Sequence, residues 1–308
     1  MKRKIAILLT TYNGEKFIQE LLDSILVTNH LESLFLYIRD DGSTDNTIRI
    51  LKQYRAKYKH NIQVYFGKNI GILPGFNFLL KKSLEGDHFY FMFADQDDKW
   101  LDVKIDKLVT SLKANDLQKP KLVHSDLYVV NENLDIISES FWQYQYLHSD
   151  SINLNQILIQ NVVTGCTIGI NRKLAEMVYP IPEEAVMHDW WIALTASAFG
   201  IIESINEPLV YYRQHSSNTI GAQEYFFSMK KLIEPFVMSK YTRQAEAFYL
   251  KYSDKLSESQ RKMLNDFIRL SYVNRIHAVK IIFTHSFYKI GFLRNLGLLA
   301  KILFQKRK

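Results

Sequence analysis

Three carboxylates follow an aromatic and apolar run in this 308-residue chain, and their types and spacing could do chemistry. The run spans residues 89–94 in HFYFMFADQDDKW and stops on Asp95, Asp97 and Asp98. Carboxylates this close repel one another, and a divalent cation would relieve the repulsion. Hard oxygen ligands suit Mg²⁺ or Mn²⁺. The alternative is an acidic loop that caps the next helix, and the spacing alone leaves both interpretations open.

The first hundred residues predict a parallel sheet that would position these acids. Short apolar runs indicate buried strands, and apolar residues at helical spacing indicate helices between them. The expected strands are 4–10, 34–39, 62–66 and 89–94, with helices at 15–27, around 48–54 and at 76–83. This alternation of strands and helices is typical of βαβ units.

Polar turns follow three of the expected strands, at Thr10–Asn13, Asp40–Asp41 and Asp95–Asp98. Open α/β sheets bind ligands at the carboxyl ends of their strands, so these turns could share one crevice. That layout suits a nucleotide diphosphate held with a metal. The chain lacks GxGxxG after the first strand and lacks GxxxxGK[ST], which counts against a dinucleotide cofactor and excludes a P-loop ATPase.

The rest of the chain predicts further strands and then a run of helices. We expect a helix at 103–112, a strand at 121–125, a hairpin within 126–137, a helix at 155–160, a strand at 161–170 and a helix from His188 to Ala198. Helical spacing recurs at 226–238, 245–252, 260–269, 272–283 and 287–304. The aromatic run FWQYQY at 141–146 is either core or a platform for a sugar ring. Cys166 is expected to be a small buried residue rather than a nucleophile.

Composition and charge describe a folded protein with an acidic body and a basic tail. Hydrophobic residues make up 47% and charged residues 23%, and no apolar stretch is long enough to span a bilayer. The single cysteine rules out an internal disulfide and fits a reducing compartment. Residues 226–308 hold 17 Lys+Arg and 5 Asp+Glu, so +12, which leaves 7 − 12 = −5 for residues 1–225. The last helix could lie on an anionic membrane, pack on the preceding domain or contact a second subunit.

Five segments in order resemble the family 2 glycosyltransferases: TTYNGEKFI, IRDDGSTDNT, FADQDDKW, MHDWWIALTASAFG and YYRQHSSN. These are inverting enzymes of the GT-A fold, and the subgroup most resembled is the bacterial rhamnosyltransferases of cell-wall and surface polysaccharide assembly. The resemblance covers about residues 4–218. It implies an α/β fold with a mainly parallel, Rossmann-like sheet flanked by helices. We expect a catalytic domain at 1–222, with a nucleotide-sugar half to about residue 100, and a helical region at 223–308.

On the donor side, the resemblance implies that Thr10 and Tyr12 contact the nucleotide base. Asp41 resembles the carboxylate that hydrogen-bonds the pyrimidine ring, whereas the neighbouring Asp40 is expected to be a turn residue. Asp95 resembles the first acid of the DXD motif, near the ribose. Asp97 resembles the second acid, a metal ligand that bridges to the diphosphate.

On the acceptor side, the resemblance makes Asp189 the general base that takes a proton from the acceptor hydroxyl. Arg213 resembles a diphosphate contact, and His215 a metal ligand or diphosphate contact. Members of the family often carry Glu-Asp where this chain has His188-Asp189, which leaves the role of His188 open. Further candidates within these motifs are Asn13, Asp98 and Trp190.

The resemblance implies transfer of L-rhamnose from dTDP-β-L-rhamnose onto a glycan or lipid-linked acceptor, with Mn²⁺ or Mg²⁺ as cofactor. The alternatives are a UDP-hexose or UDP-N-acetylhexosamine donor, or a non-catalytic scaffold that binds a glycan or nucleotide. The expected location is cytoplasmic and peripheral on the inner face of the cell membrane, where the protein could form a homodimer. A pI of about 9.1 is typical of many nucleic-acid-binding proteins. The basic helices carry no recognised nucleic-acid-binding motif, so we expect no nucleic-acid partner.

Overall fold

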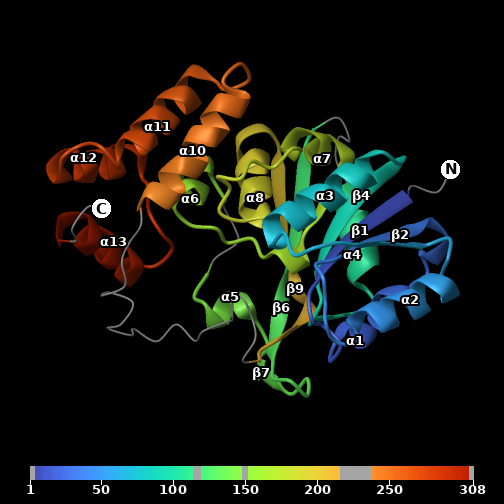
Figure 1. Cartoon of the computed structure of the whole chain (residues 1–308). Helices are drawn as coiled ribbons and strands as arrows, with labels where there is room; N and C mark the ends of the chain where they lie inside the picture. The colour runs from blue at the N-terminus through green and yellow to red at the C-terminus, as the bar shows by residue number, and fades with distance from the viewer. Residues whose placement is uncertain (1–3, 114–118, 148–151, 216–237, 305–308) are drawn as a thin grey trace.

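A computed structural model describes residues 4–113, 119–147, 152–215 and 238–304. Within these residues nine strands form one sheet (Figure 1). The strands are β1 Lys4–Thr11, β2 Leu34–Asp40, β3 Ile62–Phe66, β4 His88–Asp95, β5 Lys99–Trp100, β6 Lys121–Val130, β7 Ile136–Ser138, β8 Gly169–Asn171 and β9 Ile201–Arg213. They lie in the order β3-β2-β1-β4-β8-β6-β9-β5, with β7 paired to β6 outside this path.

Helices connect and cover the strands. The α-helices are α1 Ile18–Leu26, α2 Thr47–Lys57, α3 Ile72–Leu84, α4 Lys104–Lys113, α5 Phe141–Tyr144, α6 Leu154–Ile159, α7 Arg172–Val178, α8 His188–Phe199, α10 Met238–Tyr252, α11 Glu258–Arg269, α12 Arg275–His285 and α13 Phe292–Phe304. Two short 3-10 helices, η1 Leu31–Ser33 and η2 Gly165–Thr167, complete the described elements. The helix expected at 226–238 lies outside the described residues, except for its last position.

Alternating side chains of the strands build a core on each face of the sheet. Ile5, Ile7 and Leu9 of β1 pack with α1, α2 and α4 on one face. Ala6 and Leu8 of the same strand face the other way and pack with α3, α7 and α8. The core on this second face continues into α10 to α13, which lie together beside α6 and α8 (Figure 1). The result is a layered α/β fold, as the sequence predicts.

The sheet is parallel in its first half and mixed in its second. The pairings among β3, β2, β1 and β4 are all parallel, as expected for consecutive βαβ units. Strand β8 then pairs antiparallel with both β4 and β6, whereas β9 runs parallel to β6. The carboxyl ends of β1, β2 and β4 therefore lie at one edge, where Thr11 is level with Asp40 and Thr10 with Asp95.

Two sequence expectations need correction in the second half. The strand expected at 161–170 is wrong over most of its length, because the Thr167 amide and hydroxyl both donate to the Thr164 carbonyl, at 3.0 and 2.7 Å, and close a turn. Of the expected range, only Gly169 and Ile170 belong to a strand, β8. The strand expected at 121–125 continues to Val130, and the hairpin follows with Asn131 donating to the Asp135 carbonyl at 3.0 Å.

The C-terminal helices brace helix α8. The buried indole of Trp191 on α8 contacts the rings of Phe248 and Tyr252 on α10, with centroids 5.5 and 6.1 Å apart. Lys251 also donates to the Val178 carbonyl at 2.9 Å. Among the described residues no helix has the length and apolar character needed to cross a membrane.

Candidate active site

The three polar turns expected to share a crevice are joined by hydrogen bonds. The Asp41 amide donates to the Thr11 carbonyl at 2.8 Å. The amide group of Gln96 receives a bond from the Tyr12 backbone nitrogen at 2.9 Å and donates to the Tyr12 carbonyl at 3.1 Å. The side chain of Asn13 accepts from the Thr44 amide at 2.8 Å. The turns after β1, β2 and β4 therefore form one rigid floor.

The carboxylate of Asp40 holds its own turn, as expected. It accepts from the amides of Gly42 and Ser43 at 3.2 and 3.0 Å, and from the hydroxyls of Ser43 and Thr11 at 2.5 and 3.1 Å. Gly42 has a φ of +80°, and a Cβ there would lie 3.1 Å from the Gly67 carbonyl oxygen, so glycine is required. Asp40 thus shapes the floor without facing a ligand.

Asp41 points to the other side of this turn. Its carboxylate pairs with the guanidinium of Arg39 and accepts from the amides of Ile70 and Gly71 at 3.1 and 2.8 Å. The contact with a pyrimidine ring stays a prediction, because all the partners described here are protein groups. These partners hold the carboxylate in place.

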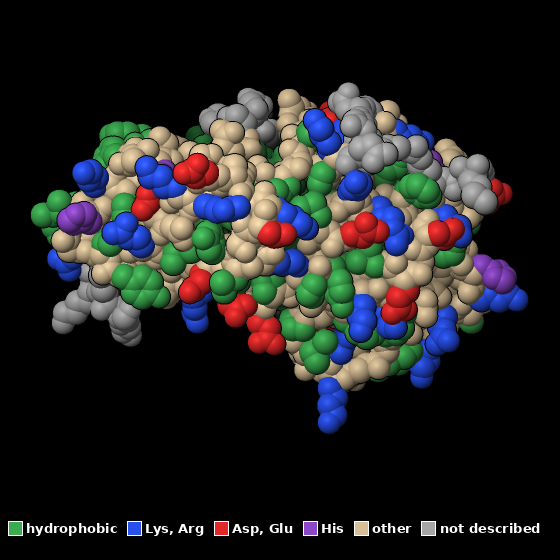
Figure 2. Space-filling view, turned by 90° about the horizontal axis from the view of Figure 1, so that it is seen from above, with side chains coloured by type: hydrophobic (Ala, Val, Ile, Leu, Met, Phe, Trp, Pro, Cys, Tyr) green, Lys and Arg blue, Asp and Glu red, His purple; other side chains and the backbone are tan. Residues whose placement is uncertain are grey.

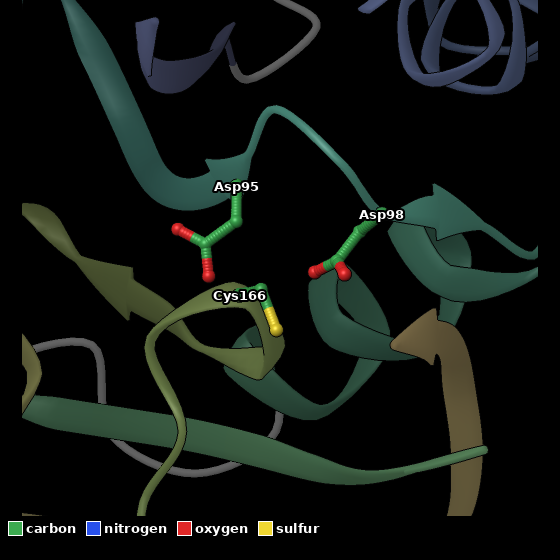
Figure 3. Close-up of side chains that lie close together, drawn as sticks. All are labelled: Asp95, Asp98 and Cys166. Carbon is green, nitrogen blue, oxygen red and sulfur yellow. The ribbon is translucent and has the colours of Figure 1, made fainter. Parts of the chain in front are cut away.

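Asp95, Asp98 and Cys166 form a compact cluster at the end of β4. One ligand atom from each lies within 4.8 Å of the other two. Figure 3 shows the three side chains pointing toward one another, Asp95 from the end of β4, Asp98 from the next turn and Cys166 from the facing turn η2. Burial, followed by the charges of Asp97 and Asp95, raises the pKa of Asp98 well above its usual range. The Asp98 carboxyl also accepts a hydrogen bond from the Cys166 thiol.

Cys166 is a neutral thiol in this cluster. It is fully buried, and burial together with the neighbouring Asp98 and Asp95 raises its pKa well above the usual range. A protonated thiol is neither a nucleophile nor a good ligand for a hard cation. The interpretation of Cys166 as a small buried residue agrees with this environment.

Asp97 and His215 lie on the other side of the same turn. The Asp97 Oδ2 and His215 Nε2 atoms are 2.8 Å apart. Two neighbouring ligands of an octahedral Mg²⁺ or Mn²⁺ stand about 3 Å apart when each is about 2.1 Å from the ion. The chemistry and spacing of this pair therefore fit one hard divalent cation.

Asp189 faces the acid cluster from the start of α8. Its carboxylate accepts from the Trp190 amide at 2.6 Å and from the Gly165 amide, so η2 connects it to Cys166. Burial raises the pKa of Asp189 to about 7. The pKa of Asp95 is also raised to about 7, by burial first, then by the charge of Asp97, then by that of Asp189. Both carboxyls remain partly exposed, as groups lining a cleft would be.

Comparisons with known proteins identify the family of this chain. Residues 6–176, more than half of the chain, match the profile of the family described as Glycosyl transferase family 2. The chain belongs to the family 2 glycosyltransferases. It is 28% identical over 233 residues to the dTDP-rhamnosyl transferase RfbG of Shigella flexneri, covering 70% of this chain and 74% of RfbG.

Solved structures share the fold of this glycosyltransferase. TarS of Staphylococcus aureus, residues 1–349 with UDP-GlcNAc, matches with a TM-score of 0.57 at 14% identity, over 92% of this chain and 80% of that one. The mannosyltransferase PcManGT of Pyrobaculum calidifontis, with GDP-Man and Mn²⁺, matches with a TM-score of 0.52 at 16% identity, over 97% and 79% of the two chains. The fold is therefore that of the GT-A glycosyltransferases.

In this glycosyltransferase, Arg213 joins β9 to the acid turn from a buried position. Its Nε donates to the Asp97 carbonyl at 2.9 Å, and its other guanidinium nitrogens bond the Glu132 carbonyl and the Glu20 carboxylate. The guanidinium also lies 4.4 Å from the centre of the Phe17 ring. These contacts make Arg213 a clamp on the turn that carries Asp97. Its predicted contact with the diphosphate stays a prediction.

The remaining candidate residues of the glycosyltransferase differ in exposure and packing. Tyr12 is 47% exposed at the edge of the floor, and the methyl group of Thr10 packs against Gly75, where a Cβ would lie 2.9 Å away. Buried His188 lies between the rings of Phe76 and Phe93, with centroids 4.0 and 5.4 Å away. Within the part of the chain that the structure describes, its ring nitrogens have no hydrogen-bond partner, and burial lowers its pKa to about 3, so it is a neutral packing residue beside Asp189.

Trp190 and the aromatic run at 141–146 serve packing in the described contacts. The Trp190 indole donates to the Ile157 carbonyl at 2.6 Å and contacts the ring of Tyr241. Trp142 is buried, and its ring meets that of His124, whereas Tyr146 is 65% exposed. Trp142 therefore belongs to the core, and the role of the run as a sugar platform stays a prediction.

Lys104 is a site residue that the sequence analysis missed. It is fully buried on α4, and its ammonium nitrogen donates to the Cys166 carbonyl oxygen at 2.6 Å and lies 3.2 Å from the centre of the Trp100 ring. Burial lowers its pKa to about 7, against the opposing influence of Cys166, Asp98 and Asp95. A buried lysine four residues after a tryptophan looks like an ordinary exposed helix residue in sequence, so no local signal identifies it.

Proposed function

We propose that this glycosyltransferase transfers L-rhamnose from dTDP-β-L-rhamnose, with inversion, onto a glycan or lipid-linked acceptor in bacterial polysaccharide synthesis. The observation that carries the mechanism is the position of Asp189, whose charge raises the pKa of Asp95 across the cleft. A proton acceptor on one side and an acid cluster on the other are what a single displacement at an anomeric carbon requires.

The protein groups then have distinct tasks. The Asp189 carboxylate takes the proton of an acceptor hydroxyl while the hydroxyl oxygen attacks the anomeric carbon. In the same step the bond between the anomeric carbon and the diphosphate oxygen breaks. Only one displacement occurs and no sugar is bound covalently to the protein, so the configuration inverts and a β-linked donor yields an α-rhamnoside. A carboxyl with a pKa of about 7 is well matched to this task near neutral pH.

Asp97 and His215 are the residues that would hold the cation, with Asp95 beside them. A bound Mn²⁺ or Mg²⁺ would supply positive charge next to the departing diphosphate. Arg213 connects the turn that carries Asp97 to β9, and Gln96 connects the same turn to the turn at Tyr12. The positions for the donor phosphates and for the nucleotide base therefore keep a fixed separation.

The rhamnose donor is supported by the name of the relative RfbG, which is aligned over 70% of this chain. The second candidate is a UDP-N-acetylhexosamine or UDP-hexose donor. It is favoured by a segment of 96 residues that is 33% identical to the poly(ribitol-phosphate) beta-N-acetylglucosaminyltransferase TarS. Both donors would use the same base and the same acid turn.

A donor panel separates these candidates. Hydrolysis of dTDP-β-L-rhamnose, UDP-glucose, UDP-GlcNAc and GDP-mannose would be measured with Mn²⁺, with Mg²⁺ and with EDTA. We expect dTDP-β-L-rhamnose to be the preferred donor and EDTA to abolish turnover. Preference for a UDP sugar would overturn the donor assignment while leaving the mechanism intact. Calorimetric binding of a donor without turnover on any acceptor would indicate a non-catalytic scaffold.

The cation ligands are tested separately by direct metal binding. In Asp97→Asn and His215→Ala, we expect the affinity for Mn²⁺, followed by electron paramagnetic resonance, to fall at least about tenfold. His60→Ala is a control, because His60 is an exposed histidine on the turn after α2. Unchanged Mn²⁺ affinity in both site variants would remove these residues from the metal site.

A further inference from the structure

Exposed apolar side chains concentrate on α12 and α13. Among the described residues, five large apolar side chains are more than 70% exposed, and four of them lie within residues 272–304. We call the following set the α12–α13 surface: Tyr272, Ile276, Phe283, Phe292, Leu296 and Phe304. The two helices pack against each other at one end of the molecule (Figure 1). Such a concentration indicates an interaction surface.

The spacing of these residues puts them on the outer side of each helix. Ile276, Lys280 and Phe283 are four and three residues apart on α12, so they form one stripe. The ring of Phe283 continues to Tyr288, with centroids 6.0 Å apart. The inner side of α12 buries Ala278 and Ile282 in the core. An outer helix of a water-soluble domain normally carries polar residues there.

Helix α13 repeats this arrangement. Phe292 and Leu296 are exposed one turn apart, whereas Leu298 and Ile302 are buried. Both helices are therefore apolar on two sides, one in the protein core and one toward solvent. The outer side is not needed to build the fold.

The charge of this region has a single sign. Residues 267–308 contain nine Lys+Arg and no Asp or Glu, a formal charge of 9 − 0 = +9. Arg275 and Lys280 are exposed on α12 itself, and Lys280 lies within the apolar stripe. At the left end of Figure 2, hydrophobic and basic side chains lie side by side, and the acidic side chains visible among them belong to residues before 267.

We propose that the α12–α13 surface binds an anionic phospholipid bilayer, with both helices lying in the interface. Apolar and aromatic side chains enter the boundary between headgroups and acyl chains, while lysines and arginines remain among the phosphates. A second copy of the chain fits this surface less well. A twofold contact would bring two regions that lack carboxylates and carry nine positive charges each against one another.

Binding to vesicles tests this proposal without any donor or acceptor. The full chain would be floated with vesicles of phosphatidylcholine alone and with vesicles that also contain phosphatidylglycerol. We expect flotation only with the anionic vesicles, and its loss at high salt. The double variant Ile276→Ser/Phe292→Ser and the single variant Lys280→Glu should each bind at least about tenfold more weakly.

Matched controls separate a local effect from a general one. Leu250→Ser removes an apolar side chain that is 71% exposed on α10, and Lys81→Glu reverses an exposed charge on α3. Both should bind vesicles as the unmodified protein does. All variants should hydrolyse the donor normally, because none of the substituted residues lines the proposed active site. A loss of membrane binding would therefore be distinguishable from a loss of sugar transfer.

Two outcomes would overturn the membrane assignment. One is equal vesicle binding by the double variant and the unmodified protein. The other is no vesicle binding together with a concentration-dependent dimer in light scattering that Ile276→Ser/Phe292→Ser abolishes. That second result would assign the surface to a second copy of the chain.

Discussion

The ammonium nitrogen of Lys104 lies 2.6 Å from the carbonyl oxygen of Cys166, so a buried cation holds the turn that faces the acids. The same turn provides the Gly165 amide that bonds Asp189. The cation also lies near Asp98 and Asp95, whose charges oppose the fall in its pKa. Lys104 is therefore a positioning residue that connects the acid cluster to Asp189.

Replacing Lys104 by Met should change how turnover depends on pH. The Cys166 carbonyl would lose its partner, and the Gly165 amide would move away from Asp189. Since that amide bond lowers the pKa of Asp189, its loss should move the acidic limb of the kcat profile to higher pH and reduce kcat at pH 7 about tenfold or more. Lys107→Met is the matched control, because Lys107 is on the same helix and pairs with exposed Glu207. An unchanged pH profile in Lys104→Met would leave Lys104 with a packing role only.

Substitution of Asp189 by Asn should abolish turnover and keep the fold. The Asn side-chain oxygen can still accept from the amides of Trp190 and Gly165, but it cannot take a proton. We expect kcat to fall by about 10² to 10⁴, with the circular dichroism spectrum and donor affinity preserved. Asp102→Asn, at an exposed acid after the motif, should remain active. Normal turnover in Asp189→Asn would mean that another group acts as the base.

Removal of one charge from the acid cluster should stabilise the metal-free protein above neutral pH. The pKa of Asp95 is raised from 3.8 to about 7, so the folded protein holds a proton there that the unfolded chain releases. The resulting penalty is complete above pH 7 and disappears as the pH falls from 7 toward 4. Asp95→Asn should therefore raise the Tm at pH 8 in EDTA by about 2 °C or more, with little effect at pH 4. A lower Tm at pH 8 would contradict this sign.

Arg213→Lys should destabilise the protein although the charge is retained. Lysine cannot bond the Asp97 carbonyl, the Glu132 carbonyl and the Glu20 carboxylate at the same time. We expect a loss of about 2 kcal/mol in the free energy of unfolding, measured with denaturant. Arg49→Lys, on the exposed face of α2, should be neutral. If stability were kept and only the donor KM rose, Arg213 would be a diphosphate contact, as the family resemblance implies.

Local patterns were sufficient to predict the first half of the fold and the acid turn. The runs that became β1, β2, β3 and β4 are short and apolar, and those of β1, β2 and β4 end at polar turns, so the position of these turns at one sheet edge follows from the parallel topology. The family motifs also led to Asp97, Asp189 and His215, and two of these, Asp97 and His215, proved to be in direct contact.

Other parts of the site depend on contacts between distant segments. Arg213 is buried because Glu20, 193 residues earlier, lies beside it. Gln96 matters because its amide group bonds Tyr12 in both directions, and a Cβ at Gly14 would lie only 2.5 Å from it. The strand β9 was not predicted either, since its sequence IIESINEPLVYYR contains a proline and three charged residues. Its pairing with β6 overrides that local signal.

The contact between Trp191 and α10 has a practical consequence for dissecting this protein. Ending the chain between residues 200 and 237 would remove α10 and uncover the indole of Trp191, two positions after Asp189. Such a fragment would aggregate or lose the alignment of Asp189, and its inactivity would say nothing about sugar specificity. Biochemical work on the reaction therefore calls for the undivided polypeptide.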